Sequence, residues 1–177
     1  MKESVADPIY SLSEKLRARG QRISFAESCT GGLVSARFAA LAGVSDVYNG
    51  AIVAYSNHVK IDVLEVPESL IRQLGAVSTS VAVAMARGAK KILRSDWSAS
   101  ITGIAGPLGG TPQKPVGTVC FAVVGPGVEW SILMHFDGDR VKIQDQSALF
   151  VVGAMTLALD EGFDGLARLT GESWPLV

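Results

Sequence analysis

The sequence is poor in aromatic residues, in charged residues and in the side chains that build disulfide frameworks or metal sites. Of its 177 residues, 7% are aromatic and 19% are charged, and it has 2 cysteines and 2 histidines. Cys29 and Cys120 lie far apart and form no CxxC pair, so we expect neither a disulfide framework nor a zinc knuckle. His58 and His135 form no HExxH motif or His/Cys cluster, so we expect no metal site and no Ser-His-Asp triad.

An excess of charge of one sign and long hydrophobic runs are missing as well. The formal net charge is -1, and no basic run is present, so we expect no nucleic-acid partner. The longest strongly apolar stretch, residues 147–159, is shorter than the ~20 residues of a membrane-spanning helix. Glu3 and Asp7 interrupt the N-terminal segment, which lacks the apolar core of a signal peptide. We expect a soluble cytoplasmic protein with no membrane partner.

Apolar residues and glycine are abundant instead. Hydrophobic residues make up 48% of the chain, and there are 19 glycines. This composition excludes disorder, and the length fits one domain. We expect a domain over residues 1–160 and a C-terminal extension over residues 161–177.

Hydrophobic periodicity and capping residues predict alternating helices and strands. The expected helices are 8–19, 33–41, a short one carrying Lys60, 67–74, one beginning at Ser78, and 140–159; the expected strands are 23–26, 51–55, 97–101, 118–124 and 130–136. The first strands are separated by helices, and the last two form a hairpin. This order predicts an α/β fold, a three-layer α/β/α sandwich with a mixed sheet of about five strands.

Unusual loops follow the first three predicted strands. They are Glu27–Gly32, the segment from Tyr55, and the glycine-rich segment 102–115. Ligands of such folds collect beyond the carboxyl ends of the strands, so we expect these loops to lie at one edge.

Ser28 lies at a predicted turn from a strand into a helix. Free backbone N–H groups and the helix dipole favour an anionic oxygen there, so its hydroxyl could act as a nucleophile beside an oxyanion hole. The alternative is that Ser28 and Thr30 only cap the helix. Gly31 and Gly32 weaken a first helical turn and indicate close approach of a ligand to the backbone.

Tyr55 and Lys60 flank the next predicted strand-to-helix junction. Lysine or tyrosine can activate a serine without histidine, provided that burial or a neighbouring cation lowers the lysine pKa. The alternative is a surface lysine beside a half-buried tyrosine. Ser45, in another glycine-containing loop, is a second candidate nucleophile, a substrate contact or a helix cap.

The segment 102–115 does not have the glycine spacing of a GxGxxG fingerprint or a Walker A loop. It could wrap a phosphate or ribose with backbone groups, with Thr102 as a polar contact, or be a wide structural turn. Arg140 lies at the start of the last helix, the unfavourable end for a cation, which suggests binding of an anion or a partner subunit, or a surface ion pair.

Five motifs together resemble the CinA C-terminal domain family over about residues 8–160. They are AESCTGG at 26–32, YSNxxK at 55–60, GAVS at 75–78, TGIAGPxGG at 102–110 and KPVGTV at 114–119. The resemblance implies a nicotinamide-nucleotide amidase, which hydrolyses nicotinamide mononucleotide to nicotinate mononucleotide and ammonia, without a cofactor. Larger family members add an N-terminal domain related to molybdopterin-binding proteins, which we expect this chain to lack.

The resemblance also implies site residues. Ser28, Tyr55 and Lys60 are the implied catalytic groups, with Ser45 left open as the alternative nucleophile. The expected substrate-binding residues are Glu27, Thr30, Gly31, Gly32, Thr102, Gly106, Gly109, Gly110 and Arg140. A small-molecule nucleotide and a further copy of the chain, in a homodimer or larger assembly, are the expected partners.

Two residues depart from the family pattern. Leu108 replaces a glycine and could narrow the pocket, and Gln144 lies near an expected basic position, which could weaken anion binding. The alternatives to the amidase are a nucleotide-binding regulatory module without catalysis and an amidase for another carboxamide.

Overall fold

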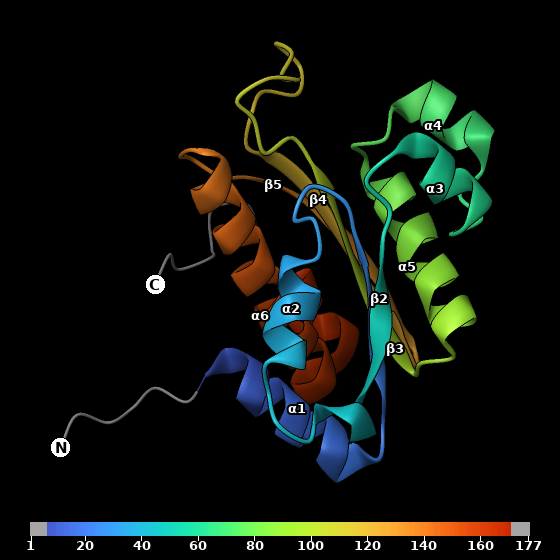
Figure 1. The fold of residues 1–177 in the computed structure, drawn as a ribbon, viewed down its shortest axis with the longest axis vertical. Helices are drawn as coiled ribbons and strands as arrows, with labels where there is room; N and C mark the ends of the chain where they lie inside the picture. Colours follow the sequence, from blue (N-terminus) through green and yellow to red (C-terminus); the bar gives the residue numbers. More distant parts are fainter. Residues whose placement is uncertain (1–6, 171–177) are drawn as a thin grey trace, which may run out of the picture.

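The computed structural model describes residues 7–170, which form an α/β fold in three layers (Figure 1). The elements in chain order are α1 (Pro8–Arg19), β1 (Ile23–Glu27), α2 (Leu33–Ala39), the 3-10 helix η1 (Val44–Asp46), β2 (Tyr48–Val53), α3 (Asn57–Asp62), α4 (Glu68–Leu74), α5 (Thr79–Leu93), β3 (Trp97–Gly103), β4 (Thr118–Gly125), β5 (Val128–His135) and α6 (Arg140–Ala167). The predicted three-layer sandwich is confirmed.

The sheet has five strands in the order β2-β1-β3-β4-β5. β1 pairs in parallel with both β2 and β3, whereas β3 with β4 and β4 with β5 are antiparallel. The mixed sheet therefore follows the expected pattern of helical crossovers and then a hairpin. All three parallel strands end at the same edge, so the loops that follow them meet there.

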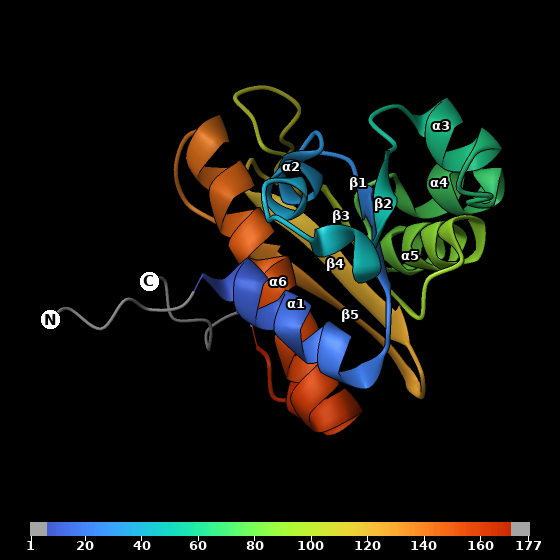
Figure 2. The same ribbon diagram turned by 60° about the horizontal axis from the view of Figure 1, so that its bottom comes forward.

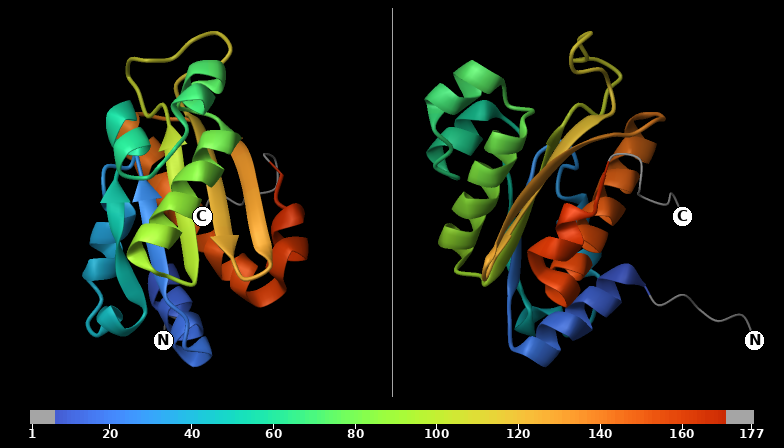
Figure 3. Two further views of the ribbon diagram at one scale, coloured as in Figure 1. Left: turned by 90° about the vertical axis from the view of Figure 1, so that its right-hand side faces the viewer. Right: turned by 180° about the vertical axis from the view of Figure 1, so that it is seen from behind.

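Helices cover both faces of the sheet (Figures 2 and 3). α1, α2 and α6 lie on one face, and α3, α4 and α5 lie on the other. Alternation along β3 explains the two interfaces: Trp97, Ala99 and Ile101 join the larger core cluster, whereas Ser100 lies beneath α5 and donates a hydrogen bond to the Ala82 carbonyl at 2.6 Å. Small residues on the second face let α5 pack close to the sheet.

The predicted ends of α1 are confirmed in detail. The Asp7 carboxylate accepts the Ile9 amide at 2.9 Å, Pro8 is the first helical residue, and Gly20 ends the helix in the left-handed conformation. Ser78 likewise caps α5. Local polar residues therefore determine where these helices begin.

Several predicted elements have bounds that differ by one or two residues, and two differ more. β2 begins at Tyr48 and ends at Val53, earlier than the expected strand 51–55, because its first residues pair with the start of β1. α6 continues past Leu159 to Ala167, with a non-helical residue at Gly162. Leu166 is fully buried in the core, so the end of α6 packs on the fold through this residue. Residues 171–177 of the expected extension lie outside the described residues.

No helix within residues 7–170 is long and apolar enough to cross a membrane.

Candidate active site

The loops that follow β1, β2 and β3 meet at one edge of the sheet, together with the N-terminus of α6 (Figure 1). They enclose a pocket of about 220 Å³. It is lined by Ser28, Cys29, Tyr55, Gly103, Ile104, Ala105, Gly106, Leu108, Gly109 and Arg140. Sequence positions more than a hundred residues apart thus form one small polar cavity.

Ser28 and Lys60 are in direct contact beside this pocket. The Lys60 Nζ lies 3.0 Å from the Ser28 Oγ and 2.7 Å from the Ala54 carbonyl oxygen. Lys60 is only 2% exposed, so the alternative of a surface lysine is wrong. The backbone amide of Ser28 donates to the Ile101 carbonyl at 2.9 Å, which ties the serine to the end of β3.

Burial lowers the pKa of the Lys60 ammonium from its ordinary value, and this effect is larger than the opposing effect of the nearby Cys29. A lysine with a lowered pKa is neutral in a larger fraction of molecules and can accept the serine proton. Burial also raises the pKa of the Cys29 thiol to about 12, so this thiol stays protonated and is a poor nucleophile. The Ser28 hydroxyl, rather than the Cys29 thiol, is therefore the candidate nucleophile of this pocket.

Arg140 and Tyr55 both line the pocket and are hydrogen-bonded to each other. The Arg140 guanidinium donates to the Tyr55 hydroxyl at 2.6 Å and to the Gly106 carbonyl at 2.8 Å. Tyr55 is 59% exposed rather than half-buried. The predicted phenol and cation are thus held together at the lining of the pocket.

Glu27 and Thr30, which we expected to bind the substrate, do not line the pocket. The Glu27 carboxylate is fully buried, and the hydroxyl of Thr30 donates to it at 2.8 Å. It also accepts the amides of Gly32, Val34 and Ser35. A side chain of the protein itself therefore occupies the N-terminus of α2, which the sequence suggested for a bound anion.

The backbone conformation at Gly31 and Gly32 requires glycine. Their φ angles are 63° and 98°, in the left-handed region that side chains with a Cβ rarely adopt. Neither glycine lines the pocket. They allow the sharp turn that places Ser28 between β1 and α2.

Thr102 and Gly110 lie near the pocket but do not line it. The Thr102 hydroxyl donates to the Ala76 carbonyl at 3.0 Å, and Lys114 donates to the carbonyls of Leu74 and Val77. These bonds hold the glycine-rich loop against the segment between α4 and α5. Of the glycines expected there, Gly106 and Gly109 do line the pocket.

Ser45 is not brought to this site. It belongs to η1, which precedes β2, and its carbonyl accepts the Arg22 guanidinium at 2.7 Å. Because Ile23 and Tyr48 pair at the start of the parallel strands, Ser45 lies at the opposite end of the sheet from Ser28. The structure therefore leaves Ser28 as the nucleophile candidate.

The model of the CinA C-terminal domain family matches residues 7–159. The chain belongs to this family. Its relatives include CinA-like proteins of Fervidobacterium nodosum, 48% identical over 81% of this chain and 34% of the relative, and of Anaeromyxobacter dehalogenans, 46% identical over 82% of this chain and 36% of the relative. The chain thus spans about a third of the length of these CinA-like relatives.

Solved CinA structures have the same fold. A CinA superfamily protein of Klebsiella pneumoniae has a TM-score of 0.83 at 33% identity, covering 86% of this chain and 95% of its own. A competence or damage-inducible protein of Enterobacter asburiae has a TM-score of 0.85 at 31% identity, covering 90% of this chain and 100% of its own. The family assignment and the fold therefore agree.

The two departures from the CinA pattern have different places in the site. Leu108 lines the pocket and is 86% exposed, so its side chain adds apolar surface at the entrance. Gln144 donates to the Cys29 carbonyl at 2.7 Å and holds the turn that carries Ser28. Sequence reasoning does not give Gln144 this role. The signal that could reveal it is the spacing of four residues from Arg140, which places both on one face of α6.

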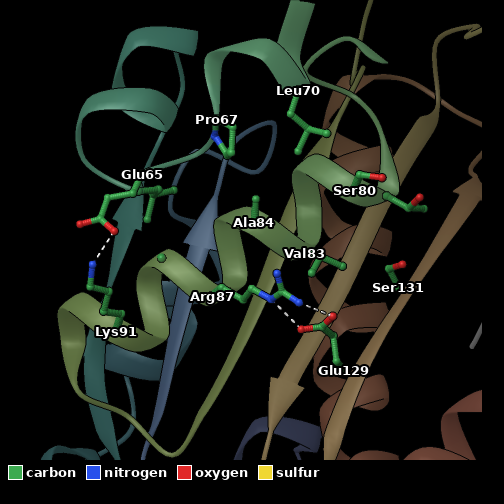
Figure 4. A pocket seen from close by; sticks show the side chains of 13 residues that line it. Glu65, Pro67, Leu70, Ser80, Val83, Ala84, Arg87, Lys91, Glu129 and Ser131 are labelled. Atoms are coloured by element: carbon green, nitrogen blue, oxygen red, sulfur yellow. Dashed lines mark hydrogen bonds and ion pairs between the residues drawn. The ribbon is translucent and has the colours of Figure 1, made fainter. Parts of the chain in front are cut away.

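A larger cavity of about 570 Å³ lies along the exposed face of α5 (Figure 4). Its cations are already paired: Arg87 binds both oxygens of Glu129 at 2.6 Å, and Lys91 contacts Glu65 at 2.5 Å. This cavity contains no counterpart of the buried Ser28–Lys60 pair. The smaller pocket is therefore the candidate active site of this CinA-family chain.

Proposed function

We propose that this chain is a nicotinamide-nucleotide amidase, which hydrolyses the carboxamide of nicotinamide mononucleotide to nicotinate mononucleotide and ammonia. The observation that carries the proposal is the buried Lys60 Nζ 3.0 Å from the Ser28 Oγ at a pocket. A serine paired with a lysine of lowered pKa suits attack on a carboxamide, and the pyridine nucleotide is the substrate that membership of the CinA family suggests.

The reaction takes place in two halves. Neutral Lys60 accepts the Ser28 proton while Oγ attacks the carboxamide carbon, and the tetrahedral intermediate collapses as the C–N bond breaks and Lys60 returns the proton to the leaving ammonia. Water then attacks the acyl-serine ester and gives a proton to Lys60. Lys60 returns this proton to Oγ as the ester C–Oγ bond breaks, which regenerates Ser28 and neutral Lys60 and releases the acid, which ionises to the carboxylate. The net reaction consumes one water and releases one ammonia.

The turn after Ser28 supplies an oxyanion donor in this mechanism. Glu27 uses the amides of Gly32, Val34 and Ser35, and the Gly31 amide donates to the Ser28 carbonyl. The amides of Cys29 and Thr30 take no part in these bonds. Cys29 lines the pocket, so we assign its amide to the developing oxyanion.

Arg140 and the glycine-rich loop contact the nucleotide in this proposal. Arg140 supplies a permanent cation at the mouth, and the backbone of Gly103, Gly106 and Gly109 surrounds the entrance. A net charge of -1 is compatible with a phosphate ligand because placed groups, rather than a basic surface, bind it.

Measuring the release of ammonia tests which carboxamide the protein hydrolyses. Purified protein is incubated with nicotinamide mononucleotide, nicotinamide riboside and nicotinamide, and we expect ammonia from the mononucleotide in preference to the other two. Ammonia from another carboxamide alone would replace the proposed substrate. Binding of the mononucleotide by calorimetry without release from any compound would identify a binding module instead.

The pH profile of kcat/KM tests the role of Lys60. Because burial lowers the pKa of Lys60 and the neutral amine is the active form, activity is expected to rise with pH through that lowered pKa and reach a plateau. The midpoint should fall clearly below the ordinary lysine value of 10.5. If kcat/KM falls as the pH is raised over this range, or if the midpoint lies at the ordinary lysine pKa, general-base catalysis by Lys60 is contradicted.

A further inference from the structure

Glu27 lies next to the nucleophile in the sequence but outside the pocket. It is the last residue of β1, is fully buried, and does not line the cavity. A buried carboxylate is costly unless hydrogen bonds replace its lost hydration. The hydrogen bonds of the Glu27 carboxylate therefore identify the part of the chain that it holds in place.

The side chain of Glu27 organises the turn that carries Ser28. One oxygen, Oε2, accepts the Thr30 hydroxyl at 2.8 Å and the amides of Gly32 and Val34 at 3.1 and 3.2 Å. The other, Oε1, accepts the Ser35 amide at 2.8 Å. Four donors from residues 30–35 thus converge on one carboxylate, which limits the positions that the turn can take.

The main chain of Glu27 is bonded to Ala54, whose carbonyl group accepts a hydrogen bond from Lys60. The Ala54 amide donates to the Glu27 carbonyl at 2.7 Å, and the Ala54 carbonyl accepts the Lys60 ammonium at 2.7 Å. Glu27 is therefore bonded both to the turn that carries Ser28 and to the residue that anchors Lys60. It fixes the serine turn through its side chain and the lysine anchor through its backbone.

We propose that the Glu27 carboxylate is a positioning residue that holds the Ser28 hydroxyl at hydrogen-bond distance from Lys60. This proposal rests on the proposed function in one respect: one of its two tests measures amidase turnover. The role requires a side chain at position 27 with two oxygen atoms that accept hydrogen bonds, because every group that contacts the Glu27 carboxylate here is an N–H or O–H donor. An amide in its place would turn one NH₂ toward those donors and lose at least one bond.

Glu27→Gln is therefore expected to lower kcat roughly 10²-fold, the size of a misplacement of about 1 Å, while KM changes less than about threefold. The unequal effect on the two constants follows because Glu27 does not line the pocket. Asp7→Ala is the matched control, since it removes a carboxylate that caps α1 far from the site. It should lower stability and leave both constants unchanged.

A second readout does not depend on turnover. The titration of the Lys60 side chain, followed by NMR of the wild type and of Glu27→Gln, should shift toward the ordinary lysine pKa as the loosened turn admits water. If the wild type releases no ammonia but this shift is seen, the amidase proposal fails and the positioning role stands. If Glu27→Gln keeps the wild-type kcat and Lys60 titration, the positioning role is overturned.

Thr30→Val keeps the test decisive if Glu27→Gln does not fold. It removes one of the four donors and leaves the carboxylate in place. We expect kcat to fall about 3- to 10-fold and the Lys60 titration to move in the same direction. Wild-type behaviour of this variant in both measurements would likewise overturn the proposal.

Discussion

Lys60→Met is expected to abolish amidase turnover, lowering kcat/KM by about 10³-fold or more, while the protein stays folded. The methionine fills a similar volume but cannot accept the proton of Ser28 or return one to ammonia. Its effect on the free energy of unfolding should stay within about 1 kcal/mol, because relief from burying an ammonium offsets the lost bond to the Ala54 carbonyl. Steady-state kinetics and chemical denaturation measure the two quantities.

Lys91→Met is the control for this substitution. Lys91 is exposed on α5 and contacts Glu65, so its loss should change neither turnover nor stability appreciably. The account would be contradicted if Lys60→Met retained more than about a tenth of the wild-type kcat/KM, since a general base contributes at least ~10²-fold.

Ser28→Ala has the larger expected effect, a loss of at least about 10⁴-fold in kcat, because it removes the nucleophile itself. The side chain is small and nearly buried, and substrate binding should persist. Binding of nicotinamide mononucleotide by calorimetry and ammonia release by a coupled assay separate the two effects.

Ser45→Ala is the matched serine control, because Ser45 lies at the opposite end of the sheet. It should keep wild-type turnover. Near-normal turnover in Ser28→Ala, or a comparable loss in Ser45→Ala, would show that the assignment of the nucleophile is wrong.

Much of the fold could be predicted because local signals determine it. Asp7, Pro8 and Gly20 delimit α1, and the hairpin between β4 and β5 contains glycine and proline at its turn. The start of β2 at Tyr48 could not be predicted in the same way, because it depends on pairing with Ile23. The continuation of α6 to Ala167 depends on burial of Leu166 in a core built from distant elements.

The burial of Lys60 is the feature of the site that could not be predicted from the sequence. Lysine on a short polar helix is usually a surface residue, and only the packing of α3 against the end of the sheet encloses it. The resemblance to the CinA family indicated Lys60 and Ser28 as partners, but it gave no distance. The 3.0 Å contact comes from the strand order, which places the ends of β1 and β2 side by side.

The turn after β1 shows the opposite case, in which a physically sound expectation was incomplete. A helix N-terminus does attract an anion, but at α2 that anion is Glu27, from the same turn. Glycine enrichment had the same ambiguity: Gly31 and Gly32 serve backbone geometry, whereas Gly106 and Gly109 line the pocket. Composition alone does not separate these roles.

Rapid-quench mass spectrometry of the protein with nicotinamide mononucleotide tests the central claim most directly, since a Ser28 nucleophile requires an acyl-serine ester during turnover. We expect a transient adduct with the mass of the nicotinate mononucleotide acyl group on the peptide that contains Ser28, absent in Ser28→Ala. Full turnover without any adduct, or an adduct on another residue, would contradict the account.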